Sequence, residues 1–330
     1  MALLVSAAIA PAAASGKVRQ SVVSFKVRNA NQTKVACDTD RGRYRISGTI
    51  IGTSKQLSKA DSVTLYLHGL GFNQSFWNYP ARGFSFAKKM AQRGHVSVIV
   101  DRLGYGLSGK PFGPASCLGG QATIAHQIIG DLKSGSYKGR SPRFKRVAVI
   151  GHSAGGTIAA LENITFDDAD ALGLLASAEQ GISSLGASFA AESARICTGR
   201  EPNPIGTEGY ALFGQTREEV AAGFFFSTPA SIFAQLQPAP NPCGDLASYM
   251  KAMRFNGRHA GAVTDPVLVV QAKKDALFPP PAVAAEASLY NNTERMTYKA
   301  LSQTAHAVTF EKGRSKLARQ VSQWLDRSGL

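Results

Sequence analysis

The segment RVAVIGHSAGGTIAALEN, residues 146–163, places a serine between two glycines where a β-branched run gives way to small residues. Gly151, Ser153 and Gly155 fit the pattern G-x-S-x-G, in which a strand turns sharply into a helix and exposes the serine hydroxyl. The bare pattern is a weak signal, but the apolar run before it and the helix-compatible run after it supply the required context. The sequence therefore predicts Ser153 as a nucleophile at a helix N-terminus, whose amides stabilise negative charge.

A serine hydroxyl attacks efficiently only when a base removes its proton. His306, in SQTAHAVTF, falls in a loop between the last predicted strand, around residues 296–298, and a C-terminal helix, and it is the predicted base. Of the other five histidines, His68 and His152 are expected in the loop motifs and His95 before a strand. His126 is expected on a helix surface and His259 at the end of an insertion.

The base in turn needs a carboxylate to orient it. Asp275, in VLVVQAKKDALFPP, lies just after a buried strand, where open α/β sheets gather their functional residues. The proline run that follows, residues 279–281, is expected to force a loop. The chain order Ser153, Asp275, His306, with each residue after a strand end, predicts a catalytic triad.

A tetrahedral intermediate also needs preorganised donors for its oxyanion. The segment LYLHGLG brings His68, Gly69, Leu70 and Gly71 directly after a strand, and its glycines let backbone amides approach a ligand closely. We therefore assign the oxyanion hole to the N–H groups of Leu70 and Ala154. His68 is expected to hold this loop rather than to take part in the chemistry.

These residues require a scaffold of buried strands. Short apolar runs without polar alternation are typical of strands covered on both faces, and so of a mainly parallel sheet with helices on each side. The N-terminal segments SVVSFKV and YRISGTIIG alternate better and predict antiparallel edge strands. The buried runs are residues 63–67, 96–100, 147–150, 172–175 and 267–270.

Helical patterns alternate with these strands, which predicts an open α/β sheet. In ATIAHQIIGDL, Ile124, Ile128 and Ile129 fall on one face and His126 points away from it. A terminal helix is expected over residues 311–327. Residues 179–258, rich in Gly, Pro, Ala and Phe, show no convincing sheet strand and are predicted to form an insertion that folds over the sheet. The core is then residues 17–178 and 259–330.

The chain has 330 residues and a formal net charge of +15, so a polyanionic partner has to be considered. A basic cluster precedes the serine motif, but no zinc-finger spacing, aromatic RNP-like run or basic heptad helix accompanies it. A solvated basic surface, weakly associated with anionic envelope surfaces, is favoured over a specific polyanion site, and no nucleic acid partner is expected.

The N-terminus, MALLVSAAIAPAAASG, combines an apolar run with the small residues of a cleavage site, and its first charge is Lys17. Residues 1–16 are interpreted as a signal peptide and the mature protein as secreted or extracytoplasmic. A disordered tail is the alternative. The run is too short for a membrane span.

Four cysteines fit this compartment, because an even number behind a signal peptide indicates disulfides. Three pairings are possible. Cys37–Cys117 and Cys197–Cys243 are favoured, since each pair then lies within one region of the chain. Four free thiols in a cytosolic protein are the alternative. No cysteine spacing indicates a metal, and neither metal nor cofactor is expected.

Together these residues resemble the α/β-hydrolase superfamily, specifically its capped esterase and lipase-like members. The resemblance covers residues 21–329 and rests on the HGLG loop, the turn DRLGYGLS at 101–108, the GHSAG elbow, Asp275 and His306. It implies a mostly parallel eight-stranded sheet with helices on both faces and an inserted cap that decides the substrate. Haloalkane dehalogenases and epoxide hydrolases carry Asp at the nucleophile position, and proline iminopeptidase-like enzymes usually carry Trp at the position of Ala154, so these relatives are disfavoured.

The expected activity is hydrolysis of small-molecule carboxylic esters through an acyl-enzyme. A lyase or carbon–carbon bond hydrolase using the same triad is the alternative within this fold. A non-catalytic ligand-binding protein would be indicated by loss of a triad residue, and none is lost. The sequence leaves the acyl group, the alcohol and the oligomeric state open.

Overall fold

The computed structural model describes residues 16–139 and 142–330. The predicted signal peptide therefore lies outside the described residues except for Gly16. Arg140, one member of the basic cluster, also lies outside them. Within the described ranges, none of the helices combines the length and hydrophobicity that crossing a bilayer requires.

The described residues form a nine-stranded sheet with the order β11-β10-β7-β6-β3-β4-β2-β1-β5. This is one strand more than the eight expected, and the additional strand is the two-residue β5, which pairs with β1 at one edge. The strands are β1 (Val18–Arg28), β2 (Arg43–Thr53), β3 (Ser62–Leu67), β4 (Ser97–Val100), β5 (Lys138–Gly139), β6 (Arg146–His152), β7 (Ala171–Leu175), β10 (Val267–Ala272) and β11 (Met296–Leu301).

The strands β4, β3, β6, β7, β10 and β11 run parallel to one another. Five of them coincide with the predicted apolar runs, and β11 with the strand expected before His306. All residues of β4, β7 and β10 are buried, as covered parallel strands should be. The two alternating N-terminal segments form the antiparallel pair β1–β2, as predicted, and β2 pairs antiparallel with β4.

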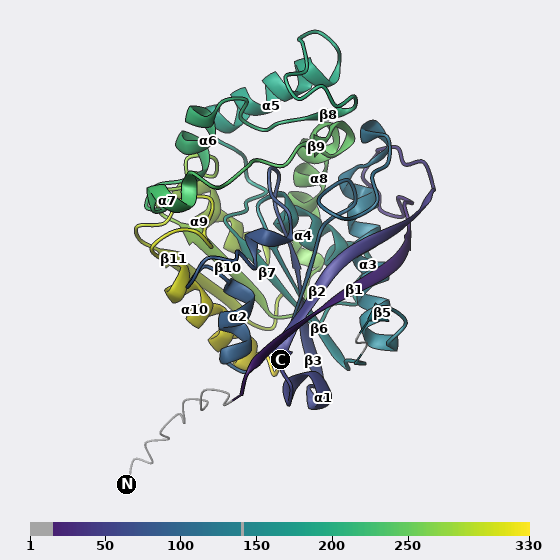
Figure 1. Ribbon diagram of the computed structural model, residues 1–330, viewed down its shortest axis with the longest axis vertical. Helices are drawn as coiled ribbons and strands as arrows, with labels where there is room; N and C mark the ends of the chain where they lie inside the picture. The colour runs from purple at the N-terminus through teal and green to yellow at the C-terminus, as the bar shows by residue number, and fades with distance from the viewer. Residues whose placement is uncertain (1–15, 140–141) are drawn as a thin grey trace.

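Two groups of helices cover the sheet (Figure 1): α2 packs against α10, and α3 against α4. The terminal helix α10 begins three residues later than expected. The helices of the core are α1 (Gln56–Lys59), α2 (Phe86–Gln92), α3 (Leu118–Ser134), α4 (Ala154–Phe166), α9 (Pro280–Leu289) and α10 (Arg314–Arg327), with 3-10 turns at Gln74–Phe76, Gly113–Ala115 and Ala260–Ala262.

The proline run at 279–281 does not extend the loop as expected. Pro279 is the N-cap of α9, and Pro280 and Pro281 occupy the first helical positions. Proline is tolerated there because the first amides of a helix have no intrahelical partner. The prolines therefore end the Asp275 loop by starting a helix.

Residues 179–258, here called the cap segment, lie above the carboxyl ends of the parallel strands (Figure 1). The segment contributes no strand to the main sheet, but β8 and β9 pair antiparallel as a small sheet of their own, which the sequence did not indicate. Its elements are α5 (Ser184–Cys197), β8 (Tyr210–Ala211), α6 (Arg217–Phe224), α7 (Ala230–Phe233), β9 (Asn241–Pro242) and α8 (Cys243–His259).

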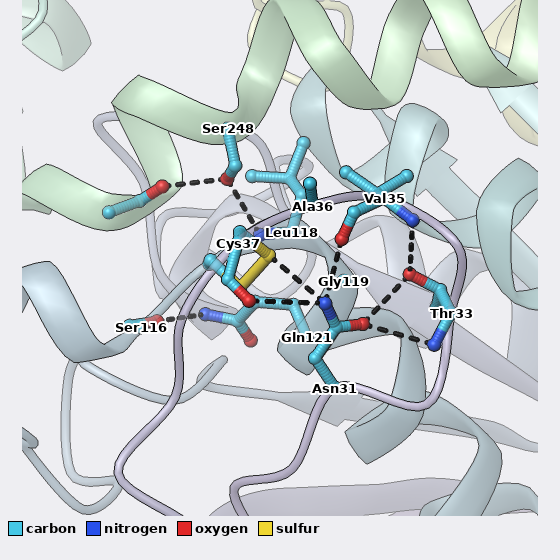
Figure 2. Close-up of a disulfide and its surroundings, with 12 residues drawn as sticks. Asn31, Thr33, Val35, Ala36, Cys37, Ser116, Leu118, Gly119, Gln121 and Ser248 are labelled. Carbon is cyan, nitrogen blue, oxygen red and sulfur yellow. Dashed lines mark hydrogen bonds between the residues drawn. A yellow bond between two sulfur atoms is a disulfide. The ribbon is translucent and has the colours of Figure 1, made fainter.

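Both favoured disulfides are present. Cys37–Cys117 joins the loop after β1 to the residue that precedes α3, and Figure 2 shows Asn31 donating to the Cys37 carbonyl at 3.3 Å. Beside it, the Leu118 amide donates to the Ser248 hydroxyl of α8 at 2.9 Å. Cys197–Cys243 connects the end of α5 to the start of α8, both within the cap segment.

Candidate active site

Ser153 occupies a strained turn between β6 and α4. Its φ of 53° and ψ of −126° lie outside the regions that a residue with a Cβ prefers. The Ser153 amide donates to the Leu175 carbonyl of the neighbouring strand β7 at 3.0 Å, which fixes the turn against the sheet. The strand–turn–helix context predicted for the serine is therefore present.

The glycines on either side of this turn are required by space. A Cβ on Gly151 would lie 2.0 Å from the Gly155 carbonyl oxygen, and one on Gly155 would lie 2.3 Å from the Leu67 carbonyl oxygen of β3. Contacts this short with backbone cannot be relieved by a side-chain movement. The two glycines thus allow α4 to start directly against the strands.

His306 and Asp275 are in direct contact, as predicted. His306 Nδ1 donates to Asp275 Oδ2 at 2.9 Å, and both side chains are almost completely buried. The other oxygen of Asp275 accepts from the amides of Leu277 and Phe278 at 2.9 and 3.0 Å, so the carboxylate is held from both sides. With Nδ1 donating, Nε2 carries the lone pair, and it makes no hydrogen bond within the described part of the chain.

The His306 loop is also held by the residue before the serine. His152 Nε2 donates to the His306 carbonyl at 2.8 Å, and the two rings lie 4.7 Å apart. Burial and the neighbouring His306 hold the pKa of His152 well below its usual range. A neutral His152 therefore connects the serine turn to the histidine loop.

The predicted oxyanion loop follows β3, and both ring nitrogens of its histidine are used. His68 Nδ1 donates to the Gly69 carbonyl at 2.9 Å, while Nε2 accepts from the Arg102 amide at 3.1 Å. Burial and the Arg102 charge hold the pKa of His68 well below its usual range. These contacts agree with the expected role of His68 in holding the loop.

The two amides assigned to the oxyanion hole have no competing acceptor among the described residues. Ala154 is the first residue of α4, where backbone amides lack an intrahelical partner. Leu70 N makes no hydrogen bond to any described residue.

Ser153, His306 and Leu70 line a single cavity of about 120 Å³. Its other walls are mainly apolar and come from the cap segment and the Asp275 loop, including Ile182, Phe213, Phe224, Leu246, Leu277 and Phe278. A second cavity of about 430 Å³ adjoins it, and Phe213 and Phe224 line both. The five residues predicted for catalysis and oxyanion binding thus belong to one compact region under the cap segment.

The sequence of residues 65–318 matches the model of the alpha/beta hydrolase family. The chain belongs to this family.

Solved structures with the same fold as this alpha/beta hydrolase include a monoacylglycerol lipase from Paleococcus ferrophilus, with a TM-score of 0.65 and 16% identity over 86% of this chain and 99% of that one. A thermophilic esterase from Thermogutta terrifontis gives a TM-score of 0.64 and 15% identity over 93% and 100% of the two chains. A membrane phospholipase A, described as a bacterial virulence factor, gives a TM-score of 0.59 and 17% identity over 93% of this chain and 87% of that one. No functionally curated protein matches the chain significantly.

One contact of this alpha/beta hydrolase that sequence reasoning missed is a buried ion pair. Arg102 Nη1 lies 2.8 Å from Asp245 Oδ2, and Arg102 Nε donates to the His68 carbonyl at 2.9 Å. Asp245 is in the first turn of α8 and also accepts from the Ser116 hydroxyl at 2.8 Å. The pair links the cap segment to the loop that contains His68 and Leu70. The turn DRLGYGLS contains Arg102, but nothing in the sequence points to its partner.

A second unpredicted contact joins the cap segment to the loop that contains His306. The Glu311 carboxylate accepts from the amides of Phe226 and Ser227, at 3.1 and 2.8 Å, and from the Thr228 hydroxyl at 2.7 Å. It also accepts from the Ala305 amide, next to His306, at 3.3 Å. Glu311 is fully buried, and these donors compensate its charge.

A tyrosine from the cap segment lies beside the serine. Tyr249 of α8 lines the smaller cavity, and its hydroxyl is close to the side chains of Ser153 and Thr157. Burial and the Glu179 charge raise the pKa of Tyr249, so the hydroxyl stays protonated at neutral pH. The hydroxyl is therefore a hydrogen-bond donor at the wall of the smaller cavity.

Proposed function

We propose that the protein is a hydrolase of small-molecule carboxylic esters that works through an acyl-enzyme. The supporting observation is the arrangement at the smaller cavity. A serine on a strained turn and the free Nε2 of a histidine already paired with a buried aspartate line the same apolar space. This is the set of groups that activates a serine for acyl transfer.

In the proposed mechanism, Ser153 Oγ attacks the ester carbonyl carbon while its proton moves to His306 Nε2. The carbonyl oxygen becomes an oxyanion that the amides of Leu70 and Ala154 stabilise. Asp275 keeps Nδ1 protonated and stabilises the imidazolium. The intermediate collapses when the bond to the alcohol oxygen breaks and His306 returns the proton to that oxygen. Water then repeats the sequence on the acyl-enzyme and releases the acid.

The cavities suggest a division of the substrate. The space at Ser153 is smaller than the roughly 300–1,000 Å³ of typical ligand pockets, so we assign it to a short acyl group. The larger cavity also has polar lining groups, among them Gln215, Thr216 and Arg217, and we assign it to the alcohol. Similar solved structures bear the names monoacylglycerol lipase, esterase and phospholipase A, which fits an ester substrate for this chain.

We also propose an extracytoplasmic location, with residues 1–16 as a signal peptide, 179–258 as the cap and the remainder as the core. Two disulfides fit an oxidising compartment. The formal net charge of +15 would favour weak association with anionic envelope surfaces, with a salt dependence typical of exposed charges.

A serine-reactive phosphonate combined with a panel of esters graded by acyl length tests the proposal. We expect one phosphonate per chain, mapped to Ser153, complete loss of turnover after labelling, and the highest rates with short acyl groups. Labelling of another residue, or turnover that survives labelling, would disprove the assignment. Cleavage of a carbon–carbon bond in preference to every ester would favour the alternative reaction on the same triad.

A further inference from the structure

Three side chains that can ligate a metal meet at the end of α4 farthest from Ser153. They are His126 of α3, Glu162 of α4 and Asp168 of the turn between α4 and β7. One potential ligand atom from each lies within 4.8 Å of the other two. Because a helix rises about 1.5 Å per residue, Glu162 is about 13 Å along α4 from Ser153, so this cluster is separate from the proposed active site.

Glu162 has no compensating partner in this position. Its side chain is fully buried, and neither carboxylate oxygen forms a hydrogen bond with any described residue. Asp168 Oδ1 is likewise buried without a hydrogen bond to the described part of the chain. An uncompensated buried carboxylate is unfavourable by several kcal/mol, so this position needs either a proton or a bound cation.

The surroundings carry excess negative charge on an otherwise basic protein. Asp167 and Asp170 flank the cluster, and the ammonium of Lys133 is nearby. Lys133 Nζ contacts the Asp168 carbonyl and, at 3.2 Å, the Asp170 carboxylate, and it forms no hydrogen bond with the Glu162 carboxylate. The cluster also lies at the C-terminal end of α4, where the helix dipole favours a cation.

We propose that His126, Glu162 and Asp168 form a binding site for a divalent cation of the zinc type. One imidazole nitrogen and two carboxylates suit zinc, whereas calcium and magnesium prefer oxygen ligands alone. Without the cation, His126 Nδ1 lies 2.6 Å from Asp168 Oδ2, and the cation would replace the proton between them. His126 and Asp168 are partly exposed, so the ion can enter from solvent while Glu162 forms the buried base of the site.

This site would connect α3 to the end of α4 and is expected to act on stability rather than on turnover. No metal was expected from the sequence, because the cysteines lack metal-binding spacing and His126 falls on the outer face of its predicted helix. The three ligands are separated by 36 and 6 positions in the chain and come together only through the packing of α3 on α4.

The test uses the full chain, treated with a chelator and dialysed, and zinc chloride as the probe. Isothermal titration calorimetry is expected to show one equivalent bound per chain, and the melting temperature is expected to rise with zinc concentration. Calcium chloride should give neither effect. Ester turnover of the metal-free protein at 25 °C should equal that of the zinc-bound protein.

His126→Ala and Glu162→Gln should each weaken zinc binding by at least about tenfold, since even removal of an outer-shell group costs that much. His259→Ala is the matched control, because His259 stacks on Phe255 at 4.1 Å just as His126 stacks on Phe166, but forms no ion pair with a described acidic residue. Equal affinity in all three variants, no binding by the wild type, or equal binding of calcium would overturn the proposal. In those cases a proton shared by Glu162 and Asp168 would satisfy the buried charge.

Discussion

Arg102 and Asp245 are separated by 143 positions in the chain and form an ion pair that is almost completely inaccessible to solvent. The arginine belongs to the turn after β4, and the aspartate to the first turn of α8 in the cap segment. Since Arg102 also holds the His68 carbonyl, the cap segment and the predicted oxyanion loop share one charged connection.

Asp245→Leu should therefore destabilise the fold by about 3–5 kcal/mol, because it leaves the Arg102 charge buried without a partner. The double variant Asp245→Leu with Arg102→Met should lose much less free energy of unfolding than the sum of the losses in the two single variants. Urea unfolding of the four proteins measures this coupling. Strictly additive losses would mean that the pair is not energetically coupled.

Ser153→Ala should abolish ester turnover, by a factor of about 10⁴ or more, while the melting temperature stays close to that of the wild type. The strained turn is kept because alanine also has a Cβ, and only one hydroxyl is lost. Steady-state kinetics and thermal unfolding provide the two readings. Residual activity within tenfold of the wild type would remove Ser153 from the role of nucleophile.

Glu311→Gln should lower kcat/KM by about tenfold, because the amide NH2 cannot accept the hydrogen bonds that the carboxylate oxygen at its position now receives. Oε1 accepts from Phe226 and Thr228, and Oε2 accepts from Ser227 and Ala305. The exposed Glu294→Gln changes the net charge equally and is the control. Ester kinetics at several substrate concentrations measure the effect. Equal kinetics for the two variants would show that this contact does not position the site.

The two disulfides should differ in their effect on activity. Each closes a long loop, with separations of 80 and 46 residues, so removing either one should cost about 4 kcal/mol in the chain-entropy model. Only Cys197 and Cys243 line the cavity at Ser153. Replacing this pair with serine should raise KM for small esters at temperatures well below melting, while replacing Cys37 and Cys117 should leave KM unchanged. The opposite pattern would show that the Cys197–Cys243 bond does not shape the cavity at Ser153.

Stability should fall as the pH rises toward 7 because of Glu286. Burial raises the pKa of this carboxyl from 4.5 to about 7, and Glu286 Oε2 accepts from the Glu179 amide at 2.6 Å. A raised carboxyl pKa means that the folded state binds the proton more tightly than the unfolded chain does. The stabilisation from this proton is therefore complete below about pH 4.5 and is lost as the pH passes about 7.

Glu286→Gln mimics the protonated form and should match the wild type near pH 4. At pH 8 it should be more stable than the wild type, by an amount on the order of 3 kcal/mol. Urea unfolding of both proteins at the two pH values isolates this group from others that titrate. A constant difference between the proteins would refute the assignment.

The main sheet and the contact between His306 and Asp275 could be predicted because each depends on local sequence. Ser153 and Asp275 each follow an apolar run, and His306 follows the predicted last strand. A parallel sheet brings the carboxyl ends of its strands to one edge, so residues that follow these strands lie near one another. The α6 helix carries a comparable local signal, since Thr216 and Glu219 form a capping box. The prolines at the start of α9 do not identify one structure from sequence, because proline is common both in loops and at the first position of a helix.

The contacts between the cap segment and the core could not be predicted in the same way. Asp245, Glu311 and Tyr249 lie in helices or loops whose sequence pattern does not reveal their distant partners. The short strand β5 depends on pairing with β1 across more than about 100 residues, and two residues carry no periodicity that identifies a strand.

The cap segment is attached to the core differently at its two ends. Near α8 it is held by the Arg102–Asp245 pair, whereas near α6 and α7 it rests on hydrogen bonds to Glu311. The stretch between these attachments, residues 229–244, contains Phe233 and Leu236, which line the larger cavity. Under the proposed division of the substrate, libraries of variants confined to this stretch should change the alcohol that is accepted while leaving the proposed short-acyl preference intact, so the two halves of the specificity could be evolved separately.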